Sequence, residues 1–199
     1  MIETTLEARP AAPARVGRPE AKFWRLSPSL RKLLVAVHVI ASVVWLGIVL
    51  VRLVLAVTAT TTPDANLIHA VYLIVDLVDR TVLWPAAIGA LVSGVILSVG
   101  TPWGLLDHYW IVVKLGITIA AIVTGFLLVD RWVAQAIVAT SGLTANGMPA
   151  SPGVAATLLI RSSIAHAIVL TAATVISSFK PWGKTPLGRR RSARRQTGA

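Results

Sequence analysis

Long stretches of apolar residues constrain this chain more than any other feature of its sequence. In the clearest stretch, residues 33–57, only His38 and Arg52 carry an ionisable side chain. A helix needs about 20 predominantly apolar residues to cross a bilayer. Charged residues make up only 14% of the sequence, whereas a soluble domain carries about 25%. The pattern predicts an all-α integral membrane protein, a four-span bundle with spans at about 33–57, 82–99, 110–128 and 157–179.

Basic residues gather in two tails that flank the apolar part of the chain. Of the 19 Lys and Arg residues, seven lie in residues 1–32 and seven in residues 180–199. Such clusters stay on the cytoplasmic side of a membrane, and an even number of spans places both tails there. We therefore expect a multi-pass protein of the inner or plasma membrane, with its N- and C-termini in the cytoplasm.

These tails also predict a partner, the anionic headgroups of the lipid bilayer, at roughly 1 kcal/mol for each basic residue near the surface. The net charge of +11 does not indicate nucleic acid, because no aromatic residue is interleaved with the C-terminal arginines. We expect residues 1–26 to be a disordered cytoplasmic tail, residues 27–183 to form the bundle, and residues 184–199 to form the second tail. The sequence leaves homo- and hetero-oligomers open.

The stretch from residue 67 to residue 99 is too long for one simple span. Its first part, residues 67–81, holds too many polar groups to face lipid: His69, Tyr72, Asp76, Asp79 and Arg80. We expect this part to be an extra amphipathic helix on the outer side, with a kink near Trp84 and Pro85 before the second span. Residues 100–109 are expected to form an inner turn, and residues 134–158 an outer loop.

Small residues four positions apart favour close contact between helices. The pairs are Gly89/Ser93, Ala90/Gly94, Gly116/Ala120 and Ala121/Gly125. A weak repeat also relates Asp79-Arg80 to Asp130-Arg131, both near the outer side.

Polar residues form stripes on the predicted helices, and ionisable groups at membrane depth are candidates for function. In the first span His38, Trp45 and Arg52 are spaced seven residues apart, with Ser42 on the same face. A second stripe contains His69, Tyr72, Asp76 and Asp79, followed by Arg80. A third contains Ser163, His166, Thr174 and Ser177. We expect the stripes to meet inside the bundle as an intramembrane polar network.

Arg52 is expected to form a salt bridge with Asp76 or Asp79. The less favoured alternatives are simple snorkelling of the Arg52 side chain to the interface and a proton or ion path through the same groups.

Two histidines on facing helices are a common way for a membrane bundle to hold haem b. His38 and His166 are the two candidates for cofactor ligands, but helical rise separates them by roughly 13 Å in depth. Interhelical hydrogen bonds are therefore favoured over haem ligation. Lys114 lies near the inner end of the third span, where its side chain can reach the headgroups. The absence of cysteine excludes Cys-ligated metals, and no metal site is predicted.

Two segments resemble the pattern of CopD-like four-helix membrane proteins, a group that includes copper-resistance D proteins and HemJ-type protoporphyrinogen oxidases. They are His38-Val-Ile-Ala-Ser-Val-Val-Trp45-Leu-Gly47 and Trp110-Ile-Val-Val-Lys114-Leu. The segments Gly100-Thr-Pro-Trp-Gly-Leu-Leu and Phe179-Lys-Pro-Trp-Gly-Lys-Thr-Pro are similar to an actinobacterial branch of the group without an assigned activity. The resemblance covers about residues 30–185.

In HemJ-type members a first-span His and a third-span Lys are functionally important, and His38 and Lys114 match them by position. The resemblance therefore implies a haem-associated redox protein using His38, His166 and Lys114. The polar segment at 67–81 and Arg52 depart from the pattern.

No catalytic motif of soluble enzymes is found in the sequence, including GxSxG, HExxH and the phosphate-binding loop. The leading prediction is a non-enzymatic membrane protein of structural or regulatory role. The alternatives are a haem b-binding redox protein and, third, a small proton or ion transporter.

Overall fold

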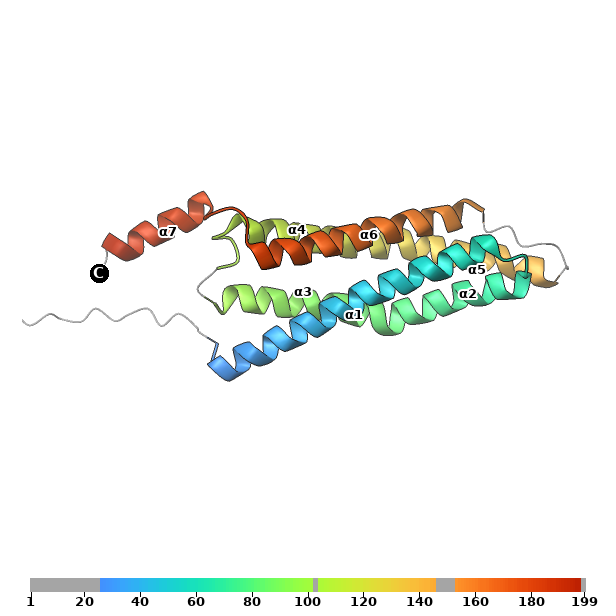
Figure 1. Ribbon diagram of the computed structural model, residues 1–199, viewed down its shortest axis with the longest axis horizontal. Coiled ribbons are helices and arrows are strands. Elements are labelled where there is room, and N and C mark those ends of the chain that lie inside the picture. Colours follow the sequence, from blue (N-terminus) through green and yellow to red (C-terminus); the bar gives the residue numbers. More distant parts are fainter. Residues whose placement is uncertain (1–25, 102–103, 146–152, 198–199) are drawn as a thin grey trace, which may run out of the picture.

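Four long helices lie side by side, and a short fifth helix extends beyond one end of them (Figure 1). The computed structural model describes residues 26–101, 104–145 and 153–197. The helices are α1 (Pro28–Thr61), α2 (Ala65–Val78), α3 (Trp84–Val99), α4 (Tyr109–Thr124), α5 (Asp130–Ala145), α6 (Gly153–Phe179) and α7 (Pro186–Thr197). A π-helical turn, η1 (Asp79–Leu83), joins α2 to α3, and a second, η2 (Gly125–Val129), joins α4 to α5. The described residues contain no β-strand, so the predicted fold class is confirmed.

Four helices are long and apolar enough to cross a membrane: Pro28–Thr61, Ala65–Val99, Tyr109–Ser141 and Gly153–Phe179. Successive helices run in opposite directions (Figure 1). The α1 helix packs against α2, α3 and α6, while α5 packs against α2 and α6. We call the end of the bundle that holds residues 26–32, 104–109 and 179–185 the basic end, and the opposite end the distal end.

The α1 helix begins where the sequence signals a start. Ser27 is the N-cap, its side chain accepts a hydrogen bond from the backbone N–H of Leu30, and Pro28 occupies the first helical position. The helix has 34 residues, which corresponds to about 50 Å at 1.5 Å per residue. It is thus longer than the predicted span of 33–57.

The helix expected at 67–81 is present as α2, and it continues directly into the second span. The only interruption is η1, where the N–H of Trp84 bonds to the carbonyl of Asp79, five residues back. Pro85 gives the physical reason, because it has no N–H and its ring crowds the preceding turn. The wider π turn accommodates this residue without ending the helix.

The prediction of an outer loop at 134–158 is wrong for most of that range, because α5 continues to Ala145 and α6 begins at Gly153. Four residues of η2 and α5 are spaced three or four positions apart and are buried: Val129, Val133, Ala136 and Thr140. Packing against α2 stabilises this Ala- and Ser-rich segment as a helix, which its composition alone does not signal.

Two apolar cores follow one another along the bundle. The distal core is built around α2 and α5 and includes Ile68, Tyr72 and Leu159. The second core lies nearer the basic end and includes Trp45, Ala87 and Leu170. Small residues of α3 face α1, since a methyl group added at Gly89 would lie 3.8 Å from Ala41.

The C-terminal basic tail contains α7, which is anchored to the turn before α4. The Thr185 hydroxyl donates to the carbonyl of Leu106 at 2.7 Å, and Arg191 forms an ion pair with Asp107 at 2.9 Å. Gly188 is needed at this contact, because an added Cβ would overlap the Asp107 backbone. Of the predicted disordered tail 1–26, only Leu26 falls within the described residues.

Candidate functional site

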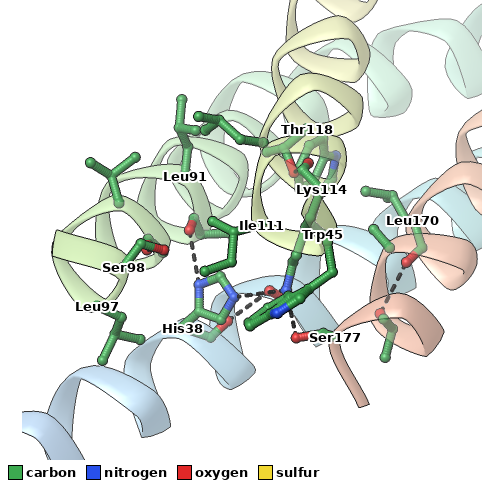
Figure 2. Close-up of a pocket in the computed structure, with 18 of the residues that line it drawn as sticks. His38, Trp45, Leu91, Leu97, Ser98, Ile111, Lys114, Thr118, Leu170 and Ser177 are labelled. Atoms are coloured by element: carbon green, nitrogen blue, oxygen red, sulfur yellow. Dashed lines mark hydrogen bonds between the residues drawn. The ribbon is translucent and has the colours of Figure 1, made fainter. Parts of the chain in front are cut away.

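A cavity of about 200 Å³ lies in the half of the bundle nearer the basic end, among α1, α3, α4 and α6 (Figure 2). It lies where α3 and α4 pack less closely than α2 and α5 do in the distal half. Its walls are mostly apolar and include Trp45, Leu91, Leu97, Ile111 and Leu170. Its polar lining residues are His38, Ser42, Ser98, Lys114, Thr118, Thr174 and Ser177.

The hydrogen bonds of His38 fix which of its ring nitrogens carries the proton. Nδ1 lies 2.9 Å from the carbonyl oxygen of Ala90, which can only accept, so Nδ1 is the donor. The Ser93 hydroxyl, 3.1 Å from Nδ1, already donates to the Gly89 carbonyl and can accept as well. The neutral ring therefore carries an unprotonated Nε2, directed into the cavity.

Lys114 faces this nitrogen from α4. Its Nζ lies 3.4 Å from Nε2 of His38 and donates to the Ser177 hydroxyl of α6 at 3.2 Å (Figure 2). Within the described ranges, none of the ion pairs involves Lys114. A cation and two hydrogen-bonding groups from three different helices thus meet at one end of an apolar cavity.

Gly94 sets the position of the His38 ring. A Cβ added at Gly94 would lie 3.0 Å from Cε1 of His38, closer than ordinary van der Waals contact. The predicted small-residue pair Ala90/Gly94 lines the cavity. At Gly116, in another predicted pair, an added Cβ would have no neighbour within 4 Å.

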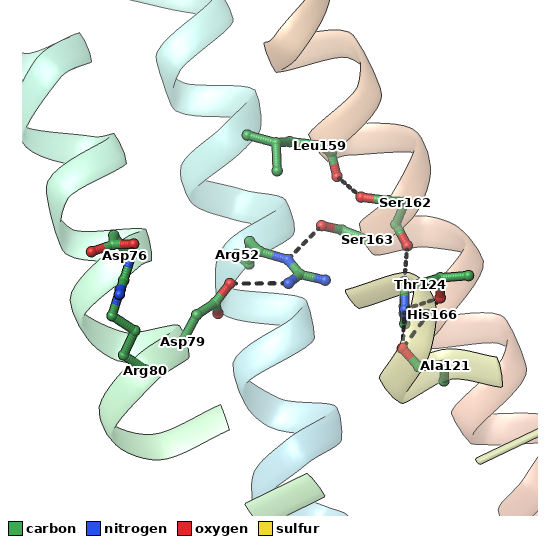
Figure 3. A network of polar contacts seen from close by, with 10 residues as sticks. All are labelled: Arg52, Asp76, Asp79, Arg80, Ala121, Thr124, Leu159, Ser162, Ser163 and His166. Carbon is green, nitrogen blue, oxygen red and sulfur yellow. Dashed lines mark hydrogen bonds and ion pairs between the residues drawn. The ribbon is translucent and has the colours of Figure 1, made fainter. Parts of the chain in front are cut away.

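Arg52 forms a salt bridge with Asp79 in the middle of the bundle. Asp79 was one of its two predicted partners. Nη1 of Arg52 lies 3.1 Å from Oδ2 of Asp79, and Nε donates to the Ser163 hydroxyl at 3.1 Å (Figure 3). Both charged residues are only 4% exposed. The three predicted polar stripes meet at this point.

His166 has a different environment from His38. Its Nδ1 lies 2.7 Å from the Ser162 carbonyl and its Nε2 lies 3.1 Å from the Ala121 carbonyl (Figure 3). Both nitrogens thus face backbone oxygens, and His166 offers no lone pair to a metal. Ala121, which contacts His166, and Lys114, which contacts His38, lie seven residues apart on α4. This spacing corresponds to about 10 Å along the helix.

The remaining residues of the predicted network do not reach the cavity. His69 Nδ1 lies 2.9 Å from the Thr140 hydroxyl and links α2 to α5. The Tyr72 hydroxyl is buried with no partner in the described part of the chain. Asp76 pairs with Arg80 at 2.8 Å on an exposed face.

Sequence reasoning missed three polar groups that complete these sites. Ser93 was recognised only as a small residue, Thr124 lies 3.3 Å from His166 Nε2, and Asp130 lines a small cavity with Arg52 and His166. Their signal is weak, because Ser and Thr are common in spans and Asp130 lies just beyond the predicted third span.

Comparisons with protein-family models, with curated proteins and with solved structures found no match to this chain. The resemblance to CopD-like proteins therefore stays a prediction. No group of three His, Asp or Glu residues able to hold a metal ion is found within residues 26–101, 104–145 and 153–197.

Proposed function

We propose that this chain is a non-enzymatic plasma-membrane protein of regulatory role that binds a lipophilic molecule carrying a carboxylate. The observation that carries the proposal is the half-buried Lys114 ammonium at the polar end of the cavity, beside His38 and Ser177. A cation removed from water is costly without an opposite charge. An anionic ligand would supply that charge, while the apolar walls would contact its hydrocarbon part.

The tails support the placement of the protein in the membrane. With both basic tails in the cytoplasm, the cavity lies toward the cytoplasmic half of the bilayer. The basic residues of α7 and of the N-terminal tail would then lie beside the anionic headgroups of that leaflet. A lipophilic acid in the same leaflet would lie at the same depth in the bilayer as the cavity.

Haem b held by both His38 and His166 does not fit this arrangement. His166 has no free lone pair, and only His38 lines the larger cavity. A volume of about 200 Å³ is also below the roughly 300–1,000 Å³ of sites for drug-sized ligands. The resemblance to HemJ-type proteins implies a tetrapyrrole that His38 alone would hold, and the experiment below includes that outcome.

Transport of protons or ions has less support. The cavity that Arg52 borders measures only about 10 Å³, and Arg52 itself is held by Asp79 and Ser163.

The test is ligand binding to the full chain in lipid nanodiscs. Decanoate and its methyl ester form a matched pair of probes that differ in charge, and quenching of Trp45 and Trp110, which line the cavity, reports binding. Charge-assisted hydrogen bonds contribute about 1.5–3 kcal/mol, so we expect Lys114→Met to weaken decanoate binding at least about tenfold. Lys114→Arg keeps the charge and is the control.

Equal affinity for the acid and the ester, or no effect of Lys114→Met, would overturn the proposal. A visible spectrum of the purified protein, oxidised and dithionite-reduced, tests the tetrapyrrole. A Soret band that is lost in His38→Ala and kept in His166→Ala would show that the ligand is a haem held by one histidine and not a simple acid.

A further inference from the structure

The larger cavity is covered toward the basic end by the turn that precedes α4. Leu105 of this turn and Trp110 of the first turn of α4 line the cavity. The start of α7 holds the turn in place, because the Thr185 backbone N–H donates to the Asp107 carbonyl at 2.9 Å and its hydroxyl donates to the Leu106 carbonyl at 2.7 Å. A ligand that arrived from the water at this end would have to displace these contacts.

Toward the middle of the bundle the cavity ends at large buried side chains. Trp45 is 4% exposed and Leu170 is 8% exposed, and both line the cavity. Further along α1, Arg52 is held by Asp79 and Ser163. The cavity therefore offers no way in from the distal half.

The contact between α3 and α4 is the weakest among the neighbouring helices around the cavity. The α1 helix packs closely against both α3 and α6, and α4 packs more closely against α6 than against α3. Side chains of α3 and α4 lie on either side of the cavity (Figure 2). In a bilayer, lipid tails border the gap between these two helices, since the cavity lies at the level of membrane-crossing segments.

The side chains at this gap are apolar and partly exposed. Gly94 faces α1, because a Cβ added there would meet the His38 ring, and Val95, about 100° further around the helix, is turned away from α1. Leu91 lies one turn before Val95 on the same side of α3. Leu91, Val95 and Leu115 of α4 line the cavity and are partly exposed. Residues that line a cavity and also reach the surface mark its opening.

The cavity is too small to enclose a long acyl chain. It measures about 200 Å³, whereas sites that enclose drug-sized ligands measure roughly 300–1,000 Å³. A chain that passes between α3 and α4 leaves its end among lipid tails, which are as apolar as leucine, so this part needs no space inside the protein. The carboxylate at the other end meets Lys114, His38 and Ser177.

We propose that the ligand is a membrane lipid acid with one long acyl chain, which enters the cavity sideways from the bilayer between α3 and α4. This inference rests on the proposed function and adds to it the class of the ligand and its route. The carboxylate binds at Lys114, the first part of the chain fills the cavity, and the rest stays in the bilayer. Leu91, Val95 and Leu115 form the entrance.

The first test compares two acids of different chain length on the full chain in lipid nanodiscs. Decanoate and hexadecanoate are added at equal mole fraction in the bilayer, and the fluorescence of Trp45 and Trp110, which line the cavity, reports binding. We expect hexadecanoate to bind at least as tightly as decanoate, because its additional length stays among the lipid tails.

A closed cavity would reject the longer acid. Hexadecanoate binding about tenfold weaker than decanoate binding would overturn the inference, and it would leave the proposed function intact if decanoate still binds more tightly than its methyl ester. Binding of neither acid would overturn both.

The second test narrows the entrance. Val95→Phe places a larger side chain at the gap, and we expect it to slow the association of hexadecanoate about tenfold in stopped-flow fluorescence. Val92→Phe is the matched control on the same helix, because Val92 is 50% exposed and does not line the cavity. Association as fast in a folded Val95→Phe variant as in the unmodified protein would overturn the inference. If Val95→Phe does not fold, the comparison of chain lengths in the unmodified protein decides by itself.

Discussion

The two halves of the bundle treat a buried cation in opposite ways. In the distal half and the middle, Arg52 is paired with Asp79, bonded to Ser163 and enclosed by tightly packed side chains. In the half nearer the basic end, Lys114 contacts His38 and donates a hydrogen bond to Ser177, and it borders a cavity. The first cation is neutralised within the fold, whereas none of the described acidic side chains forms an ion pair with the second.

Side-chain shape explains why the halves differ. Branched and aromatic residues of α2, among them Val71, Tyr72 and Val75, fill the contact with α5. In α3 the residues with the smallest side chains turn toward α1 and the His38 ring instead of toward α4. The α3 and α4 helices consequently pack less closely, and the cavity lies between them.

The largest expected effect in this comparison comes from breaking the closed pair. Arg52→Leu leaves the Asp79 carboxylate buried and unpaired, and we expect a loss of about 3–5 kcal/mol in the free energy of unfolding. Unfolding in mixed detergent micelles, followed by helical circular dichroism, measures it. The double variant Arg52→Leu with Asp79→Leu should recover most of the loss, and Lys114→Met should change stability far less. A Lys114→Met variant as unstable as Arg52→Leu would contradict the comparison.

A second prediction compares one leucine from each half on the same helix, α6. Leu159 is 1% exposed in the distal core, whereas Leu170 lines the cavity. Leu159→Ala should cost about 2–5 kcal/mol, toward the lower end, since lipid tails are as apolar as leucine. Leu170→Ala should cost less, because it enlarges a space that already exists. The same unfolding measurement compares the two variants. Equal losses in the free energy of unfolding would mean that both halves are packed alike, contrary to the comparison.

The smallest expected effect concerns the floor of the His38 site. Gly94→Ala must shift the His38 ring, because the new methyl group would lie 3.0 Å from Cε1. We expect decanoate binding to weaken about three- to tenfold, or up to 1.4 kcal/mol, with the fold intact. Gly116→Ala, with nothing within 4 Å of the added Cβ, is the matched control. Weakening of equal size in both variants would show that His38 is not positioned by Gly94.

Much of the architecture could be predicted from residue patterns alone. Long apolar stretches predicted the four spans, and seven-residue spacing placed Trp45 and Arg52 on the buried face of α1. The salt bridge of Arg52 followed from the cost of an unpaired charge. The error at 134–158 arose because Ala, Ser and Thr fit both loops and helices, and packing against α2 decided between them.

The candidate site was less accessible to sequence reasoning. His38 and Lys114 could be named, but their contact depends on how α1 and α4 are placed on either side of the cavity. His38 and His166 look equivalent in sequence, because each is a histidine within an apolar span. Only the structure separates them, because one ring nitrogen of His38 faces the cavity whereas both ring nitrogens of His166 face backbone carbonyl groups.

The sequence by itself determined that this chain is helical, that four helices can cross a membrane, and that ionisable residues must turn inward. It could do so because hydrophobic length and helical period are local properties, set by residues near one another in the chain. The tertiary structure alone decided that Asp79 pairs with Arg52, that Lys114 borders a cavity, and that His166 lies between two carbonyl groups. Those outcomes depend on the depth and rotation of one helix against another, which side-chain packing sets across distances that no local pattern records.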